Sequence, residues 1–79
     1  MQVEVKLFAS LRRFRPPEAQ GSTLIVELAD DATVQNLLDK LGISNEEAEI
    51  ILIKGLRAEL SVPLKEGAQV SLFPMLGGG

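Results

Sequence analysis

Hydrophobic and polar residues alternate with a period of two in three segments of the chain, residues 2–8, 23–28 and 70–73. In the first segment Val3 and Val5 fall on one face, while polar side chains fall on the other. This period is typical of a β-strand with one buried face. The sequence therefore predicts three such strands, the first and second of which can pair antiparallel across the intervening loop.

A helical period follows the second of these segments. Val34, Leu37, Leu38 and Leu41 stand at positions i, i+3, i+4 and i+7, which places them on one face of an α-helix. The helix is predicted to begin near residue 33, after two aspartates that favour its positive end, and to stop at residue 42, a glycine.

Shorter elements complete the prediction. Residues 10–15 can form one or two helical turns with Ser10 as the cap, ended by two prolines, and residues 16–22 then form a loop. Residues 44–47 have the spacing of a capping box and predict one further turn. Residues 50–53 are rich in β-branched residues and are expected to form a buried strand.

The last third of the chain adds turns and short strands. Lys54 and Gly55 predict a turn that needs positive φ, and residues 56–60 can return as a short strand. Residues 65–68 predict another turn before the final strand.

The resulting order predicts an α+β protein with the ubiquitin-like β-grasp fold, a mixed sheet packed against one main helix. The first and last strands are expected to pair in parallel at the centre of the sheet. We expect one domain over residues 1–74 and a flexible, glycine-rich functional tail over residues 75–79.

Composition narrows the possible functions of this fold. The 79 residues are 46% hydrophobic and 24% charged, as in an ordinary globular domain. Neither cysteine nor histidine occurs, which removes thiolate chemistry and most metal sites. The net charge of −3 argues against nucleic-acid binding, and the short apolar runs argue against membrane insertion, so a cytoplasmic protein is expected.

Two aromatic residues are candidates for a docking surface. In the predicted strands Val70 and Leu72 face the core, so parity sends Phe73 outward, on the same side as Phe8. Exposed apolar side chains beside the tail would suit a partner protein, although either ring could instead turn into the core. The cluster Arg12, Arg13 and Arg15 and the acids Glu46, Glu47 and Glu49 are interpreted as solvated surface and helix capping.

Several segments together resemble a known family. These are Val5-Lys6-Leu7-Phe8-Ala9-Ser10-Leu11-Arg12, Ala32-Thr33-Val34 with Leu37-Leu38, Lys65-Glu66-Gly67-Ala68-Gln69-Val70, and Phe73-Pro74 followed by terminal glycines. They resemble the MoaD/ThiS family of ubiquitin-like sulfur-carrier proteins along essentially the whole chain. The small subunit of molybdopterin synthase is the branch that the chain resembles more than the shorter ThiS proteins.

The resemblance implies a carrier, not an enzyme, that acts as the non-catalytic small subunit of molybdopterin synthase. A partner adenylating enzyme of the MoeB/ThiF type would use ATP to activate the carboxylate of Gly79, and a sulfur donor enzyme would convert it to a thiocarboxylate. The large synthase subunit, of the MoaE type, would then receive the sulfur. The carrier itself would bind no cofactor and no metal.

The tail residues acquire roles from the same resemblance. Glycine lacks a Cβ atom, so Gly77 and Gly78 could thread a narrow channel in a partner. Phe8, Phe73, Pro74, Met75 and Leu76 are the expected partner-binding residues.

Other functions remain open from the sequence. The same chemistry could supply sulfur for the thiazole of thiamin, or Gly79 could be joined to lysines of target proteins, as in a ubiquitin-like modifier. A plain interaction domain with an inert tail is a further alternative.

Overall fold

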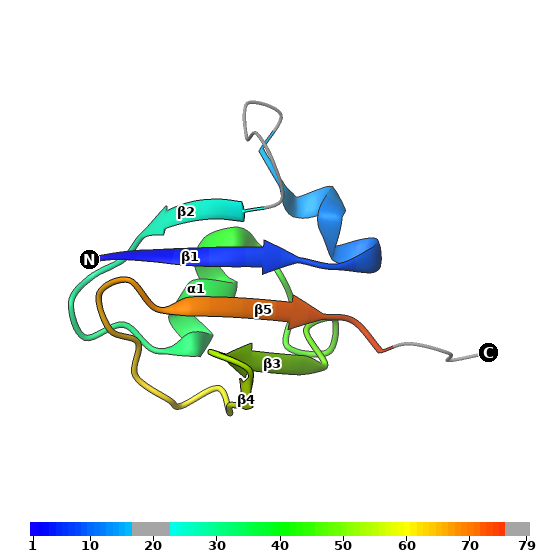
Figure 1. The fold of residues 1–79 in the computed structure, drawn as a ribbon. Helices are drawn as coiled ribbons and strands as arrows, with labels where there is room; N and C mark the ends of the chain where they lie inside the picture. Colours follow the sequence, from blue (N-terminus) through cyan, green and yellow to red (C-terminus); the bar gives the residue numbers. More distant parts are fainter. Residues whose placement is uncertain (17–22, 76–79) are drawn as a thin grey trace.

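The computed structural model describes residues 1–16 and 23–75, which form a five-stranded mixed sheet with one α-helix across one face (Figure 1). The elements in chain order are β1 (Gln2–Leu7), η1 (Ala9–Phe14), β2 (Thr23–Glu27), α1 (Val34–Leu41), β3 (Ile50–Ile53), β4 (Leu56–Arg57) and β5 (Gln69–Phe73). In the sheet the strand order is β2-β1-β5-β3-β4. No helix within the described ranges is long and apolar enough to cross a membrane.

The centre of the sheet is the parallel pair of β1 and β5, in which Val5 lies opposite Val70 and Leu7 opposite Leu72. β2 pairs antiparallel with the outer side of β1, and β3 pairs antiparallel with β5. The predicted mixed sheet, with its first and last strands side by side, is confirmed.

The core lies between the sheet and α1. Val3, Val5 and Leu72 are among the fully buried side chains of the sheet, and the apolar stripe of α1 covers them with Val34, Leu37 and Leu38. Burying a side chain of this size stabilises a fold by about 1.5–3 kcal/mol. The alternation in the sequence therefore corresponds to two faces of the sheet. We call the face that packs against α1 the covered face and the other the open face.

Both ends of α1 are closed as the sequence predicts. Thr33 is the N-cap, and Gly42 ends the helix in the left-handed region at φ 79°. The hydroxyl of Thr33 accepts the N–H of Asn36 at 3.3 Å, and the Asn36 side-chain oxygen accepts the N–H of Thr33 at 2.8 Å. This reciprocal cap is made by an asparagine, which the sequence reading did not assign.

The turn between β3 and β4 also matches its prediction. Lys54 and Gly55 adopt φ values of 51° and 80°, the two positive angles of a tight hairpin turn whose twist matches the strands. Of these two residues, Gly55 takes up a positive φ angle without steric strain, because it has no Cβ atom.

Two strand predictions were wrong in part. The strand expected over residues 56–60 is limited to Leu56–Arg57, because the chain turns again where the Val62 N–H bonds the Glu59 carbonyl. The strand Ile50–Ile53 has one buried side chain, Ile51, since the parity of a sheet turns Ile50 toward the open face.

The helix after β1 was also predicted incorrectly at its start. It is a 3₁₀ helix whose N-cap position is Phe8, not Ser10, and no side chain caps it. The backbone determines this start, because the Leu11 N–H bonds the Phe8 carbonyl at 3.1 Å and the Leu11 side chain is fully buried. Of the loop predicted after it, residues 17–22 lie outside the described part of the chain.

Candidate functional site: the end of the sheet beside Phe8 and Phe73

The rings of Phe8 and Phe73 stack against each other, with centroids 4.3 Å apart and planes inclined by 9°. The parallel pairing of β1 and β5 brings them together, and it extends to Phe8 through a bond from its N–H to the Leu72 carbonyl at 3.1 Å. Both side chains are half-buried, and they lie on the open face. The predicted juxtaposition of the two rings is confirmed.

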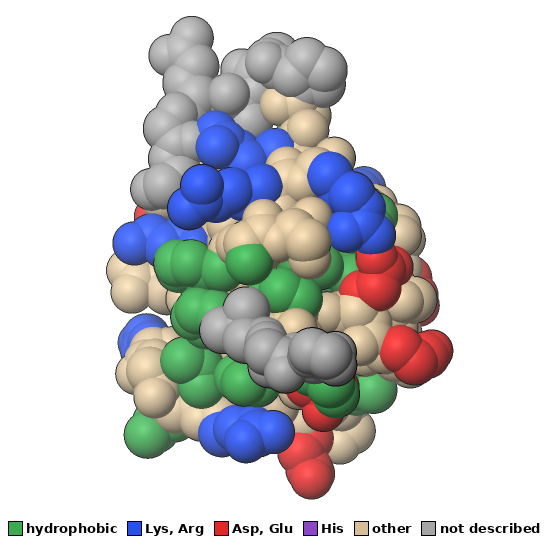
Figure 2. Space-filling view, turned by 90° about the vertical axis from the view of Figure 1, so that its right-hand side faces the viewer, with side chains coloured by type: hydrophobic (Ala, Val, Ile, Leu, Met, Phe, Trp, Pro, Cys, Tyr) green, Lys and Arg blue, Asp and Glu red, His purple; other side chains and the backbone are tan. Residues whose placement is uncertain are grey.

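A third apolar side chain adjoins this pair. Ile50 of β3 lies opposite Phe73 of β5 and is half-buried on the same face. We call Phe8, Ile50 and Phe73 the aromatic patch. Figure 2 views this end of the molecule, where hydrophobic side chains gather with Lys and Arg side chains above and below them and Asp and Glu side chains mainly to the right.

The residues that follow β5 differ from one another in exposure. Pro74 is buried in the free chain, and its expected role in partner binding stays a prediction. Met75 is 63% exposed and continues the chain from the aromatic patch. Leu76, Gly77, Gly78 and Gly79 lie outside the described residues, and their expected roles remain predictions.

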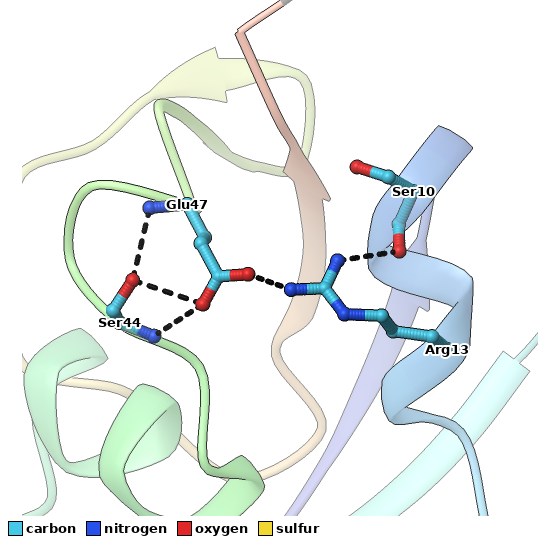
Figure 3. A network of polar contacts seen from close by, with 4 residues as sticks. All are labelled: Ser10, Arg13, Ser44 and Glu47. Atoms are coloured by element: carbon cyan, nitrogen blue, oxygen red, sulfur yellow. Dashed lines mark hydrogen bonds and ion pairs between the residues drawn. The ribbon is translucent and has the colours of Figure 1, made fainter.

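An ion pair links the segments on either side of the end of β5 (Figure 3). Nη2 of Arg13, in η1, pairs with Oε2 of Glu47, in the loop before β3. Because β5 lies between β1 and β3, this contact joins the segment after β1 to the segment before β3. Nη1 of Arg13 also donates to the Ser10 carbonyl at 3.0 Å, and its guanidinium lies 4.5 Å from the centre of the Phe14 ring.

Glu47 is held in place for this contact by Ser44. The Ser44 hydroxyl donates to Oε1 of Glu47 at 2.9 Å, and the Glu47 N–H donates to the Ser44 Oγ at 3.3 Å (Figure 3). The capping-box spacing predicted this local turn, which is confirmed. Its ion pair with Arg13 was missed, because the two residues stand 34 positions apart and each was interpreted as solvated surface or capping.

The described residues include an apolar surface patch but no metal-binding cluster. Among residues 1–16 and 23–75, no group of three or more aspartate or glutamate side chains is placed to hold a metal ion. What this end of the sheet presents is the apolar aromatic patch, with the exposed Met75 following directly from β5.

Comparisons with known proteins agree with this fold. The family model described as Mut7-C ubiquitin matches residues 1–77. No curated protein sequence matches the chain.

Among solved structures, the crystal structure of SAMP1 from Haloferax volcanii is 29% identical, with a TM-score of 0.72 over 100% of both chains. A second crystal structure, of H. volcanii small archaeal modifier protein 1, is 26% identical, with a TM-score of 0.73 over 95% of this chain and 98% of that one. A chain in the complex of subunits 1 and 2 of the molybdopterin-converting factor from Helicobacter pylori is 25% identical, with a TM-score of 0.60 over 100% of both chains. The predicted ubiquitin-like fold and the resemblance to sulfur carriers of the MoaD type are confirmed.

Proposed function

Because the chain belongs to the Mut7-C ubiquitin family, we propose that it is a ubiquitin-like sulfur carrier that acts through the carboxylate of Gly79. The single observation that carries the proposal is the position of the stacked Phe8 and Phe73, where β5 passes into the segment that leads to Gly79. A partner that docks on the aromatic patch would have this segment beside it. The fold supplies the docking surface, and the partner supplies the catalytic groups.

The proposed chemistry begins with activation of a poor electrophile. An oxygen of the Gly79 carboxylate attacks the α-phosphorus of ATP in a partner adenylating enzyme, and pyrophosphate leaves. The persulfide of a sulfur donor enzyme then attacks the acyl-adenylate carbon, AMP leaves, and an acyl disulfide links carrier and donor. A second thiol of the donor attacks the donor sulfur of that disulfide, so that the thiocarboxylate leaves and the donor keeps an internal disulfide. In this proposal Gly77 and Gly78 let the segment enter the narrow active site of that enzyme.

Docking by the aromatic patch is supported by its geometry. Stacked aromatic rings and an aliphatic neighbour give a rigid apolar surface, and such surfaces provide most of the binding energy in protein interfaces. Met75, exposed and flexible in its side chain, would add contact area to different partners.

The acceptor of the sulfur is proposed to be the large subunit of a molybdopterin synthase. The similarity to a chain from a complex of two molybdopterin-converting factor subunits supports this proposal. Thiamin thiazole synthesis remains the alternative acceptor pathway. Addition of each acceptor system to the thiocarboxylate form would distinguish the two, because only the cognate acceptor would return the protein to the carboxylate.

The direct test is the intact mass of the protein after incubation with ATP, an adenylating enzyme of the MoeB/ThiF type and a sulfur donor. The expected result is a mass gain equal to the replacement of one oxygen atom by sulfur. Deletion of Gly79 removes this gain, whereas Ile25→Ala, on the far edge strand, retains it. If the mass does not change with an activating enzyme that loads another carrier, the proposal is wrong.

A second candidate function is attachment to other proteins as a modifier. The similarity to small archaeal modifier protein 1 favours it specifically. Activated Gly79 would then be attacked by a lysine amine of a target, with AMP leaving and an amide bond forming. Isolation of the tagged protein under denaturing conditions, followed by mass spectrometry of branched lysine peptides, would detect this function separately from sulfur loading.

A further inference from the structure

A groove lies at the opposite end of the sheet from the aromatic patch. It has a volume of about 360 Å³. It is lined by residues 53, 54 and 56–58 of the β3–β4 hairpin region and by residues 62–66 and 68 of the segment that follows. Ile53 lies opposite Val70, at the start of β5, whereas Ile50 lies opposite Phe73, at its end. We call this site the hairpin groove.

The inner surface of the hairpin groove is apolar. Among its lining residues Leu64 is buried, Ile53 and Val62 are half-buried, and Leu56 is 74% exposed. An exposed leucine next to an apolar hollow costs solubility and adds nothing to the core. The arrangement therefore suits an apolar side chain supplied from outside.

The rim of the groove is basic, although the chain as a whole is acidic. Lys54, Arg57 and Lys65 carry positive charges there, and Glu66 is the acid among the lining residues. The carboxylate of Glu66 already accepts the N–H of Gln2 at 3.0 Å. Within the described residues, the three basic side chains form no ion pair and no hydrogen bond, so their charges are available to an anionic partner.

The sheet edge beside the groove also suits an extended chain. The Ala58 N–H bonds the Ile51 carbonyl at 2.9 Å, so the alternation of an antiparallel pair turns the N–H and C=O of Arg57 away from β3. β4 is the edge strand on this side of the sheet, and an edge strand can pair with an added peptide strand.

We propose that the hairpin groove binds an extended acidic segment of a partner protein. Apolar side chains at alternate positions of that segment would enter the groove between Leu56 and Leu64, and its carboxylates would meet Lys54, Arg57 and Lys65. Because the groove and the aromatic patch lie at opposite ends of the sheet, a protein bound here leaves the patch accessible. This inference is independent of the proposed sulfur chemistry.

The test uses two capped eight-residue peptides, one alternating valine with glutamate and a control alternating valine with lysine. Both are titrated into the isotope-labelled full chain, and backbone amide shifts are followed by NMR. The acidic peptide is expected to give saturable shift changes at residues 53–58 and 62–68, and the basic control is expected to give none. The binding should weaken as salt is raised.

Substitutions in the hairpin groove test whether the acidic peptide binds there. Leu56→Ala is expected to weaken binding of the acidic peptide about tenfold, because it removes most of the exposed apolar surface of that side chain. The double change Arg57→Glu with Lys65→Glu should abolish it. Ile25→Ala is the matched control, since Ile25 is also an exposed hydrophobic residue, 54% accessible, but lies on the opposite edge strand.

Three outcomes would overturn the proposal: no saturable shifts up to about 1 mM acidic peptide, equal binding of the basic control, or shifts that map to the aromatic patch. The thermal midpoint of each variant is measured first. If the variant with both Arg57→Glu and Lys65→Glu does not melt cooperatively, Lys65→Gln replaces it. If Lys65→Gln and Leu56→Ala both bind the acidic peptide as tightly as the parent protein, the proposal is likewise wrong.

Discussion

The two faces of the central strand pair β1 and β5 have different tasks, although they are built from alternate residues of the same segments. On the covered face Val5, Leu7, Val70 and Leu72 are buried under α1. On the open face the same strands carry Lys6 and Ser71, and they end in the stacked Phe8 and Phe73. One residue of displacement along the strand thus separates a side chain that holds the fold from one that is free to contact a partner.

The largest expected effect is on the covered face. Leu72→Ala should lower the free energy of unfolding by about 2–5 kcal/mol, because Leu72 is fully buried and the cavity left behind cannot be filled by its neighbours. Urea unfolding followed by circular dichroism measures the change. The neighbouring open-face variant Ser71→Ala should change stability by no more than about 0.5 kcal/mol. Equal losses in the two variants would contradict the division between the faces.

A smaller effect is expected where the covering helix begins. Thr33→Ala removes the hydroxyl that accepts the Asn36 N–H, and it should cost about 1 kcal/mol. The thermal midpoint reports the loss, with Lys40→Ala on the exposed side of α1 as the control. A Thr33→Ala protein as stable as the parent would show that Asn36 alone closes the helix.

On the open face, substitution should affect binding more than folding. The coupling between Phe8→Ala and Phe73→Ala in a double-mutant cycle should be about 0.5–1.5 kcal/mol in stability, the usual contribution of an aromatic pair. Either variant should also slow loading by the adenylating enzyme. Loading at the parental rate by both variants would move the docking surface elsewhere on the protein.

The smallest effect is expected for the ion pair beside the end of β5. Arg13 is 56% exposed, so Glu47→Gln should cost no more than about 1 kcal/mol. The loss should shrink as the ionic strength rises, because salt screens the exposed charge. Unfolding measured at low and high salt tests this, with Glu49→Gln as the matched control. A salt-independent loss would mean that Glu47 acts through Ser44 and not through Arg13.

The sequence predicted those helices and strands whose apolar residues recur at a regular spacing and lie on one buried face. The alternation from Val3 to Leu7 and the helical spacing from Val34 to Leu41 each report a single buried face, and the structure confirms both. Parity along β1 and β5 was also enough to place Phe8 and Phe73 together, once the parallel pairing was assumed.

What the sequence did not predict depends on contacts between distant segments or on backbone bonds. The start of η1 at Phe8 follows from a main-chain bond and the burial of Leu11, not from a capping side chain at Ser10. The Arg13–Glu47 pair joins residues that stand 34 positions apart, so no local pattern indicates it. The hairpin groove forms between the β3–β4 hairpin and the irregular segment that follows it, and neither a helical nor a strand period reports how such a segment folds back. The burial of Pro74 likewise depends on what surrounds the end of β5.

The parallel pairing of β1 with β5 also bears on how the protein is made. Glu4 pairs with Gln69 and Leu7 with Leu72, so the middle of the sheet cannot form until nearly the whole described chain has left the ribosome. Before that point β1 with β2, and α1, can form from nearer contacts, but β3 and β4 have no strand to join them to β1. Phe8 lacks its stacking partner for the same period. The aromatic patch therefore cannot form before Phe73 has been synthesised, and an enzyme that recognises it would not bind a shorter nascent chain.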